Sequence, residues 1–266
     1  MCVPPGARPP VPPADLRTIS GGDGPDERAG DDVIITSEDA TRFRAYLARA
    51  GGEGDAGVVI APDVRGLHPF YEELAERFAA AGLHAIAIDY FGRTAGTERR
   101  PDDFPFREHS SRTTPAGVQA DVAAAIGHLR GATEARRVFV VGFCFGGRVA
   151  FNAGADQHDL AGVVGFYGVT RRRDEGDHAA PIEKVDRMRA PVLGLFGGAD
   201  GAIPAADNEA FDRALAGRGI EHHLVTYPGA PHSFFDRSFA EHRSACDDAW
   251  RRVLGFIATG DPAARA

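Results

Sequence analysis

Short and almost continuous apolar runs recur along the chain, and they constrain the fold more than any other feature of the sequence. They lie at residues 58–61, 85–88, 138–141, 163–167, 192–196 and 224–227. Runs of this length suit strands that are buried on both faces of a parallel sheet. Four further stretches carry apolar residues at helical spacing: 70–78, 118–129, 211–215 and 249–256. The alternation predicts right-handed crossovers and an α/β fold, a mostly parallel sheet with helices on both faces.

Changes in composition indicate the domain organisation. Residues 1–30 contain seven prolines and five glycines, a composition that resists packing and predicts a flexible N-terminal tail. Residues 31–262 then form one α/β domain, which opens with an antiparallel hairpin of 33–36 and 43–47. Residues 91–113 fit neither the strand period nor the helix period, so we expect an insertion there that arches over one end of the sheet.

The charge balance narrows the choice of partners. Thirty Lys and Arg residues against 38 Asp and Glu residues give a net charge of −8, whereas a nucleic-acid binder needs a concentrated basic face. Lys184 is the single lysine and follows no glycine-rich turn, which excludes a lysine-dependent phosphate loop. Residues 142–147 lack the G-x-G-x-x-G pattern, and His222-His223 have no partner at ligand spacing. We therefore expect neither a nucleotide cofactor nor a metal, and the sequence leaves open whether the protein is a monomer or a dimer.

Cysteine usage and hydropathy indicate the compartment. Cys2, Cys144 and Cys246 cannot build a disulfide framework, and none belongs to a CxxC pair, which favours a reducing compartment. No apolar run approaches the roughly 18 residues that span a bilayer. The N-terminus also lacks the apolar stretch of a secretory signal. A cytoplasmic protein with no membrane partner is the expectation.

The strongest candidate for chemistry is Cys144, in a glycine-rich turn directly after the apolar run 138–141. Residues Gly142–Gly147 read G-F-C-F-G-G and precede a helical stretch, which is the strand–turn–helix context of a nucleophile elbow with cysteine in place of serine. Glycines at the flanks let the turn close tightly, and the start of the helix favours thiolate at the sulfur. The alternative is a buried structural cysteine beside a packing turn.

Two further reactive residues follow strands of their own. Asp200 comes after the run 192–196 and could orient a histidine, although a turn aspartate that caps the next helix is the alternative. His232 comes after the run 224–227 and could take up the thiol proton, unless it is a solvated surface histidine. Ligands of open parallel sheets bind at the carboxyl ends of the strands. The order Cys144, Asp200, His232 is that of α/β-hydrolase triads, so we expect the three to meet.

The sequence here resembles the dienelactone hydrolases (carboxymethylenebutenolidases), α/β-hydrolases with a cysteine nucleophile. The resemblance rests on Gly142–Gly147, Gly197–Asp200 and Gly229–Phe234, and it runs from about Val33 to the last predicted helix. It also includes Ala61–Gly66, Asp89–Arg93 and Gly165–Gly168, each of which follows a predicted strand. The fold it implies is the α/β-hydrolase fold.

The resemblance also implies roles for individual residues. Cys144 would be the nucleophile, His232 the general base and Asp200 its orienter. The backbone N–H groups of Phe145 and Val64 would form the oxyanion hole. The resemblance further implies that Arg93 holds a substrate carboxylate and that Tyr167 lines the pocket. The alternatives are an ordinary ion pair for Arg93 and simple packing for Tyr167.

The chain departs from the family pattern at two positions. Asp63 stands where the family has a glutamate that interacts with the resting cysteine, and its shorter side chain could instead be a polar loop residue. Asp236 stands where the family has a second carboxylate-binding arginine, and Arg237 follows it. An aspartate repels a carboxylate, so Arg237 would have to reorient to supply the missing cation.

Together these observations predict a cysteine-dependent hydrolase that forms a thioester acyl-enzyme. The expected substrates are lactones and small esters, including those that bear a carboxylate. One alternative is a carboxylesterase, thioesterase or acyl transferase of the same fold that acts on a different substrate. A second alternative is a non-catalytic homologue that binds a small ligand, which predicts the loss of a triad member. All three members are present.

Overall fold

Eight strands form one sheet in the order β1-β2-β4-β3-β5-β6-β7-β8 in the computed structural model of the chain, which describes residues 7–16, 30–52, 54–156, 158–172 and 180–266. The strands are β1 (Gly30–Thr36), β2 (Arg42–Ala48), β3 (Ala56–Ala61), β4 (His84–Ile88), β5 (Arg137–Phe143), β6 (Gly162–Phe166), β7 (Val192–Gly197) and β8 (His222–Tyr227). The first two form the predicted antiparallel hairpin, and β2 is also antiparallel to β4. From β4 to β8 all neighbours are parallel.

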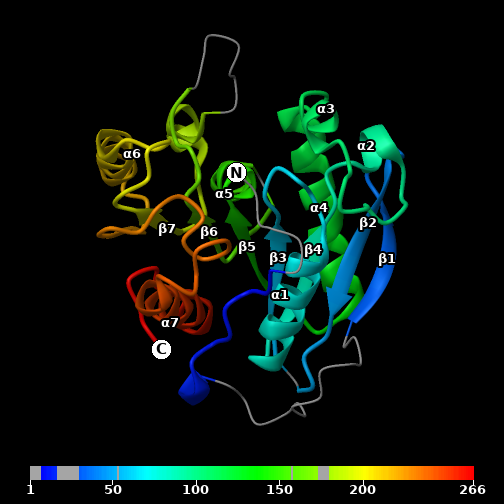
Figure 1. Cartoon of the computed structure of the whole chain (residues 1–266), viewed down its shortest axis with the longest axis horizontal. Helices are drawn as coiled ribbons and strands as arrows, with labels where there is room; N and C mark the ends of the chain where they lie inside the picture. Colours follow the sequence, from blue (N-terminus) through cyan, green and yellow to red (C-terminus); the bar gives the residue numbers. More distant parts are fainter. Residues whose placement is uncertain (1–6, 17–29, 53, 157, 173–179) are drawn as a thin grey trace.

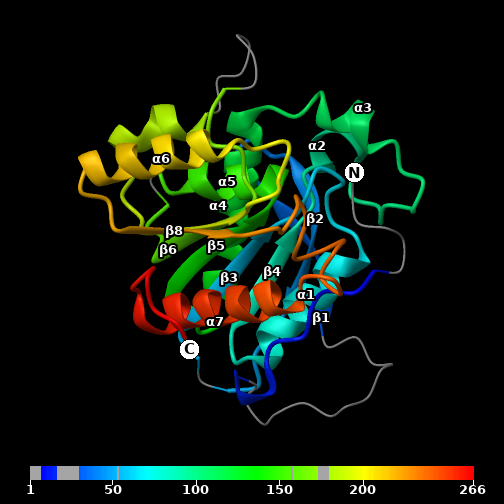
Figure 2. The ribbon, with the colours of Figure 1, turned by 60° about the vertical axis from the view of Figure 1, so that its left-hand side comes forward.

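Seven α-helices and two 3-10 helices connect the strands in the described part of the chain. They are η1 (Ala14–Leu16), α1 (Pro69–Ala80), α2 (Gly92–Ala95), α3 (Phe106–Ser110), α4 (Pro115–Ala132), α5 (Phe145–Ala153), η2 (Pro181–Arg187), α6 (Ala205–Gly217) and α7 (Arg243–Thr259). Helices α1 and α7 cover one face of the sheet, and α4, α5 and α6 cover the other (Figures 1 and 2). Thr114 caps α4 by accepting a hydrogen bond from the Gly117 N–H, as its Thr-Pro start predicts.

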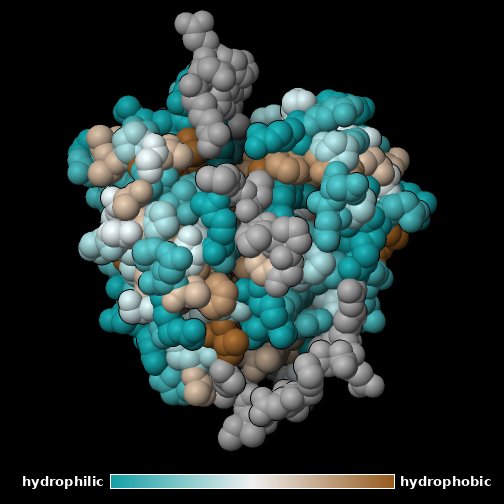
Figure 3. Space-filling model, viewed as in Figure 1, coloured by the Kyte–Doolittle hydropathy of each residue, from teal (hydrophilic) through white to brown (hydrophobic). Residues whose placement is uncertain are grey.

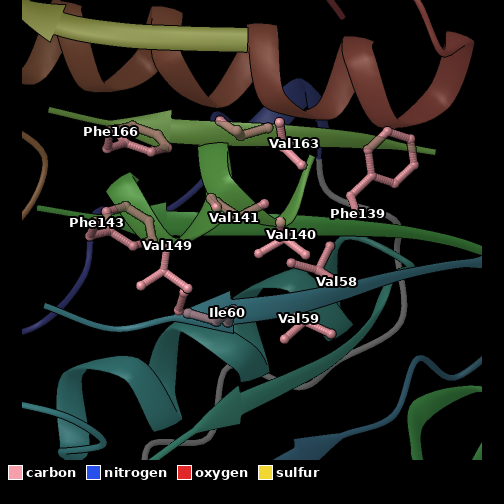
Figure 4. Packing of buried hydrophobic residues seen from close by; sticks show 14 of the residues in the cluster. Val58, Val59, Ile60, Phe139, Val140, Val141, Phe143, Val149, Val163 and Phe166 are labelled. Atoms are coloured by element: carbon pink, nitrogen blue, oxygen red, sulfur yellow. The ribbon is translucent and has the colours of Figure 1, made fainter. Parts of the chain in front are cut away.

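The central strands are buried on both faces, which explains why they appear in the sequence as continuous apolar runs. Every residue of β3, β4, β6 and β7 is buried. Figure 4 shows valine and isoleucine side chains of β3 and β5 packed together, with Val149 of α5 pointing toward Ile60. Covering helices remove both faces of a parallel sheet from water, so no alternation with polar residues is needed.

The N-terminal segment corrects one expectation. The predicted flexible tail covers residues 1–30, but residues 7–16 pack against the domain, while 1–6 and 17–29 lie outside the described residues. The indole N–H of Trp250 on α7 donates to the carbonyl of Pro10 over 3.0 Å, and Arg251 pairs with Asp15. Proline fixes part of the backbone in advance, so docking such a segment costs little conformational entropy.

The stretch 91–113 contains α2 and α3 and lies beyond the carboxyl ends of the parallel strands (Figure 1). The ring of Phe104 stacks on that of His109 and also packs against Phe91. Hydrophilic side chains cover most of the face shown in Figure 3, with apolar ones scattered among them. No helix among the described residues has the length and hydropathy to cross a bilayer.

Candidate active site

Cys144 sits on a strained turn between β5 and α5, as the elbow motif predicts. Its backbone has φ 56° and ψ −111°, a region that a non-glycine residue adopts only when its surroundings hold it there. The two flanking glycines are required by close backbone contacts. A Cβ on Gly142 would lie 1.8 Å from the Gly146 carbonyl oxygen, and a Cβ on Gly146 would lie 1.9 Å from the Ala61 carbonyl oxygen. The turn therefore holds the cysteine side chain above the sheet, partly exposed.

The structure brings His232 and Asp200 together beside this cysteine. Nδ1 of His232 lies 2.7 Å from Oδ2 of Asp200, and the imidazole also forms a hydrogen bond with Cys144. Asp200 is buried just after β7, and its other oxygen accepts from the Ala202 N–H over 2.8 Å. With Nδ1–H assigned as the donor to Asp200, Nε2 is left to accept the thiol proton.

The electrostatics of this cluster favour the charged imidazole. Burial alone lowers the pKa of His232, but the hydrogen bonds to Asp200 and Cys144 outweigh it and raise the pKa to about 9. The charged imidazole therefore lies directly beside the Cys144 side chain.

The two backbone N–H groups predicted to bind an oxyanion belong to Phe145 and Val64. Phe145 is the first residue of α5 and Val64 lies in the loop after β3. In the part of the chain that the structure describes, neither amide donates a hydrogen bond. The contact of Gly146 with the Ala61 and Pro62 carbonyls brings the first turn of α5 against this loop. The role of these two amides as oxyanion donors stays a prediction.

Asp63 makes its polar contacts with residues of its own loop and of the start of α1. Its Oδ1 accepts from the Arg65 N–H over 2.8 Å, and the carboxylate lies 3.6 Å from Arg65 Nε and 3.8 Å from His68 Nε2. Burial raises its pKa, but His68 and Arg65 reverse that effect and lower it. The Asp63 N–H donates to the Tyr71 hydroxyl over 3.0 Å. These contacts are those of the polar loop residue that the sequence leaves as the alternative.

Arg93 forms ion pairs within the protein, which corrects its expected role as a ligand of a substrate carboxylate. Its Nη2 and Nε lie 2.8 and 3.0 Å from the two carboxylate oxygens of Asp121 on α4, which is fully buried. It also pairs with Asp39 in the turn of the β1–β2 hairpin. The charge of this guanidinium is already balanced by two carboxylates, and its N–H groups already donate to them. It therefore attracts a substrate carboxylate only weakly. This is the ion pair that the sequence leaves as the alternative.

Tyr167 lies next to the imidazole and contacts an aspartate. Its ring centroid is 5.0 Å from that of His232, and its hydroxyl donates to Asp236 Oδ2 over 2.9 Å. The backbone N–H of Arg237 donates to the other oxygen of Asp236. Substrate binding by the Arg237 guanidinium stays a prediction. The sequence marks Asp236 only as a departure from a family pattern, and nothing local predicts that it is buried against Tyr167, 69 residues away.

A separate cavity of about 220 Å³ lies between the N-terminus of α1 and the insertion. It is lined by Ala7, Arg8, Arg65, His68, Pro69, Phe70, Glu73, Arg100, Pro101, Asp102, Phe104 and Phe106. It borders the loop that carries Val64, but Cys144, Asp200 and His232 are not among the lining residues. Its cations are already paired, Arg8 with Glu73 and Arg100 with Asp89. Among the described residues no cluster of His, Cys, Asp and Glu has the geometry to hold a metal ion.

A mostly parallel sheet with a cysteine at a strand–helix elbow, and with an acid and a histidine after later strands, defines an α/β-hydrolase. The model of the "Dienelactone hydrolase family" matches residues 43–260. The chain belongs to the dienelactone hydrolase family, which confirms the predicted fold and the prediction of a hydrolase that acts on esters or lactones.

Individual relatives support this assignment. A Synechocystis sp. protein named "Putative carboxymethylenebutenolidase" is 30% identical over 227 residues, 82% of this chain and 92% of the relative. A protein of the same name from Escherichia coli O157:H7 is 29% identical over 212 residues, 75% of each chain. The crystal structure of a "Putative Dienelactone Hydrolase from Klebsiella pneumoniae subsp. pneumoniae MGH 78578" superposes with a TM-score of 0.71 at 28% identity, covering 86% of this chain and 99% of that one.

Proposed function

We propose that this chain is a cysteine-dependent hydrolase of a lactone or small ester, with Cys144 as nucleophile, His232 as general base and Asp200 as its orienter. The observation that carries the proposal is the strained backbone of Cys144, which holds the side chain in hydrogen-bond contact with an imidazole paired to Asp200. Strain of this kind costs about 1–3 kcal/mol, so the surrounding structure must sustain it. The names of the relatives favour a lactone as substrate.

The first half of the reaction forms the acyl-enzyme. The Cys144 thiol proton moves to Nε2 of His232, and the sulfur attacks the carbonyl carbon of the substrate. The oxygen of the tetrahedral intermediate becomes negative and accepts from the Phe145 and Val64 N–H groups. On collapse the C–O ester bond breaks, and the leaving oxygen takes the proton from His232. In a lactone that oxygen stays attached to the acyl group, so the ring opens and a thioester remains.

The second half restores the enzyme. Water gives a proton to His232 and attacks the thioester carbon, and the same two N–H groups hold the oxyanion. The C–S bond then breaks, which releases a carboxylic acid and leaves the sulfur as thiolate beside the imidazolium. Asp200 keeps its hydrogen bond to Nδ1 throughout, and therefore holds the imidazole in the tautomer that both half-reactions need.

Turnover of a cis and trans pair of dienelactones and of p-nitrophenyl acetate tests the proposal. Cys144→Ala should abolish turnover of every substrate while the far-UV circular dichroism stays unchanged. Cys246→Ala is the matched control, because Cys246 is buried on α7, where burial raises the pKa of its thiol to about 12. Undiminished turnover in Cys144→Ala would refute the proposal. A Cys144-dependent turnover of the ester alone would keep the triad and exclude dienelactones.

A further inference from the structure

Asp236 is a buried carboxylate whose partners, in the part of the chain that the structure describes, are all uncharged. It is 1% exposed. The Tyr167 hydroxyl, the Ser233 hydroxyl and the Arg237 backbone N–H donate to it. Within the described residues no arginine, lysine or histidine forms an ion pair with it. Hydrogen-bond donors make the charge tolerable in the interior, but they do not cancel it at a distance.

This charge lies one tyrosine side chain away from the proposed catalytic imidazole. Tyr167 joins the two, because its ring is 5.0 Å from that of His232 and its hydroxyl is 2.9 Å from Asp236. The ring of Phe143, which directly precedes Cys144, is 6.4 Å from Tyr167 and 5.7 Å from Phe235. Aromatic surroundings exclude water, so the field of the carboxylate reaches the reacting atoms with little screening.

The groups that face Asp236 do not offset its charge. They are Tyr167 after β6, Ser233 and the Arg237 N–H on its own loop, Asp63 after β3, Tyr71 on α1 and Cys246 on α7. Burial and the Asp63 carboxylate raise the pKa of Asp236 to about 6, so the group is still ionised at pH 8. The guanidinium of Arg93 is held by Asp39 and Asp121.

We propose that Asp236 makes this site selective for substrates whose acyl group carries no negative charge. The inference rests on the proposed function, since it narrows the substrate class of the same site to uncharged lactones and esters. It makes dienelactones, whose acyl part carries a carboxylate, disfavoured substrates. An acyl chain bound at Cys144 that ends in a carboxylate adds a second negative charge to the site that Tyr167 connects to Asp236. For two unit charges about 8–10 Å apart at an effective dielectric of about 20, the repulsion lowers kcat/KM by at least about tenfold.

A matched pair of esters tests this selectivity in the wild-type enzyme. The substrates are p-nitrophenyl hexanoate and the mono-p-nitrophenyl ester of glutaric acid, whose acyl chains are similar in length and differ in charge. We expect kcat/KM at pH 8 to favour the neutral ester by at least about tenfold. At pH 5 this ratio should shrink, since Asp236 is then protonated while glutarate is still mostly ionised. His232, whose pKa is about 9, is mostly protonated at both pH values, so its charge changes the ratio little.

Two variants assign the effect to its residue. Asp236→Asn should lower the ratio of kcat/KM for the neutral ester to kcat/KM for the anionic ester by about tenfold. The substitution removes the negative charge and keeps the shape of the side chain. Asp248→Asn is the matched control, because Asp248 also accepts from a tyrosine hydroxyl, that of Tyr227 at 2.9 Å, but is paired with Arg252 and Arg265. It should leave the ratio unchanged. The ratio is the readout because a general loss of activity cannot move it.

Several results would overturn the inference. A wild type that uses both esters equally at pH 8, or that prefers the anion, contradicts it whether or not any variant folds. If Arg237→Ala then abolished a preference for the anion, that arginine would be the carboxylate ligand. An Asp236→Asn variant with the wild-type ratio also contradicts it. Turnover that survives Cys144→Ala refutes the proposed function instead. A wild type that opens lactones but hydrolyses neither ester contradicts the inference and leaves the proposed function standing.

Discussion

Replacing Asp200 by asparagine removes the charge that holds His232 and should change both stability and activity in a way that depends on pH. Asparagine can still accept from Nδ1–H, but it carries no charge and can present its amide instead. The pKa of His232, raised to about 9 in the folded wild type, should fall. The folded pKa lies above the unfolded value of about 6.5, so the stability it supplies is complete below about pH 6.5 and is lost as the pH rises through 9.

The size of this effect follows from the raised pKa. At about 1.36 kcal/mol per pKa unit, the rise from 6.5 to about 9 corresponds to roughly 3 kcal/mol in favour of the imidazolium. Asp200 shares this stabilisation with Cys144, so we expect Asp200→Asn to cost about 1–2 kcal/mol more at pH 6 than at pH 9.5. Loss of the correct tautomer should also lower kcat/KM for an ester by on the order of 10²–10⁴-fold.

Urea unfolding followed by the fluorescence of Trp250, the single tryptophan, measures the stability at both pH values. Asp212→Asn is the control, because Asp212 also faces a histidine, His222, at 3.4 Å but is half exposed. An exposed pair of this kind is worth little, so this variant should show almost no pH-dependent difference. A loss of stability in Asp200→Asn that is equal at pH 6 and pH 9.5 would refute the reasoning.

Three further predictions concern stability. Gly146→Ala should lower the free energy of unfolding in urea by at least about 2 kcal/mol, because its Cβ would meet a β3 carbonyl oxygen at 1.9 Å. Gly127→Ala is the control: it lies in open space on α4, so it should raise that free energy by about 0.5–1 kcal/mol. Similar effects of the two substitutions would contradict the elbow geometry. Arg93→Ala should lower the free energy of unfolding by about 2–4 kcal/mol, since it leaves the buried Asp121 carboxylate without its paired cation. Unchanged stability together with a higher KM for anionic esters alone would instead support a substrate-binding role for Arg93. Asp236→Asn should raise the unfolding free energy by about 1–2 kcal/mol at pH 8 and much less at pH 4, because a folded pKa of about 6 makes the ionised carboxylate costly as the pH rises through 6. An equal gain at both pH values would exclude the charge as the cause.

The sequence by itself determined the architecture and the elbow. Continuous apolar runs are typical of parallel strands covered on both faces, and β3, β4, β6 and β7 are buried along their whole length. The role of the glycines that flank Cys144 could be predicted from the sequence, because a tight turn is a local feature formed by five consecutive residues. Asp200 and His232 could be placed near Cys144 because each follows a parallel strand, and the carboxyl ends of parallel strands meet at one edge.

The tertiary structure alone decided which charges meet. Arg93 pairs with Asp39 and Asp121, 54 and 28 residues away, and this pairing diverts it from the substrate role that its motif implies. Asp236 is held by Tyr167 from 69 residues away, and the segment 7–16 docks on a tryptophan 240 residues beyond Pro10. Periodicity reports which face of an element is buried, but not which side chain of another element lies opposite. The partner of a charge, and with it the charge of the site, is therefore set only when the chain has folded.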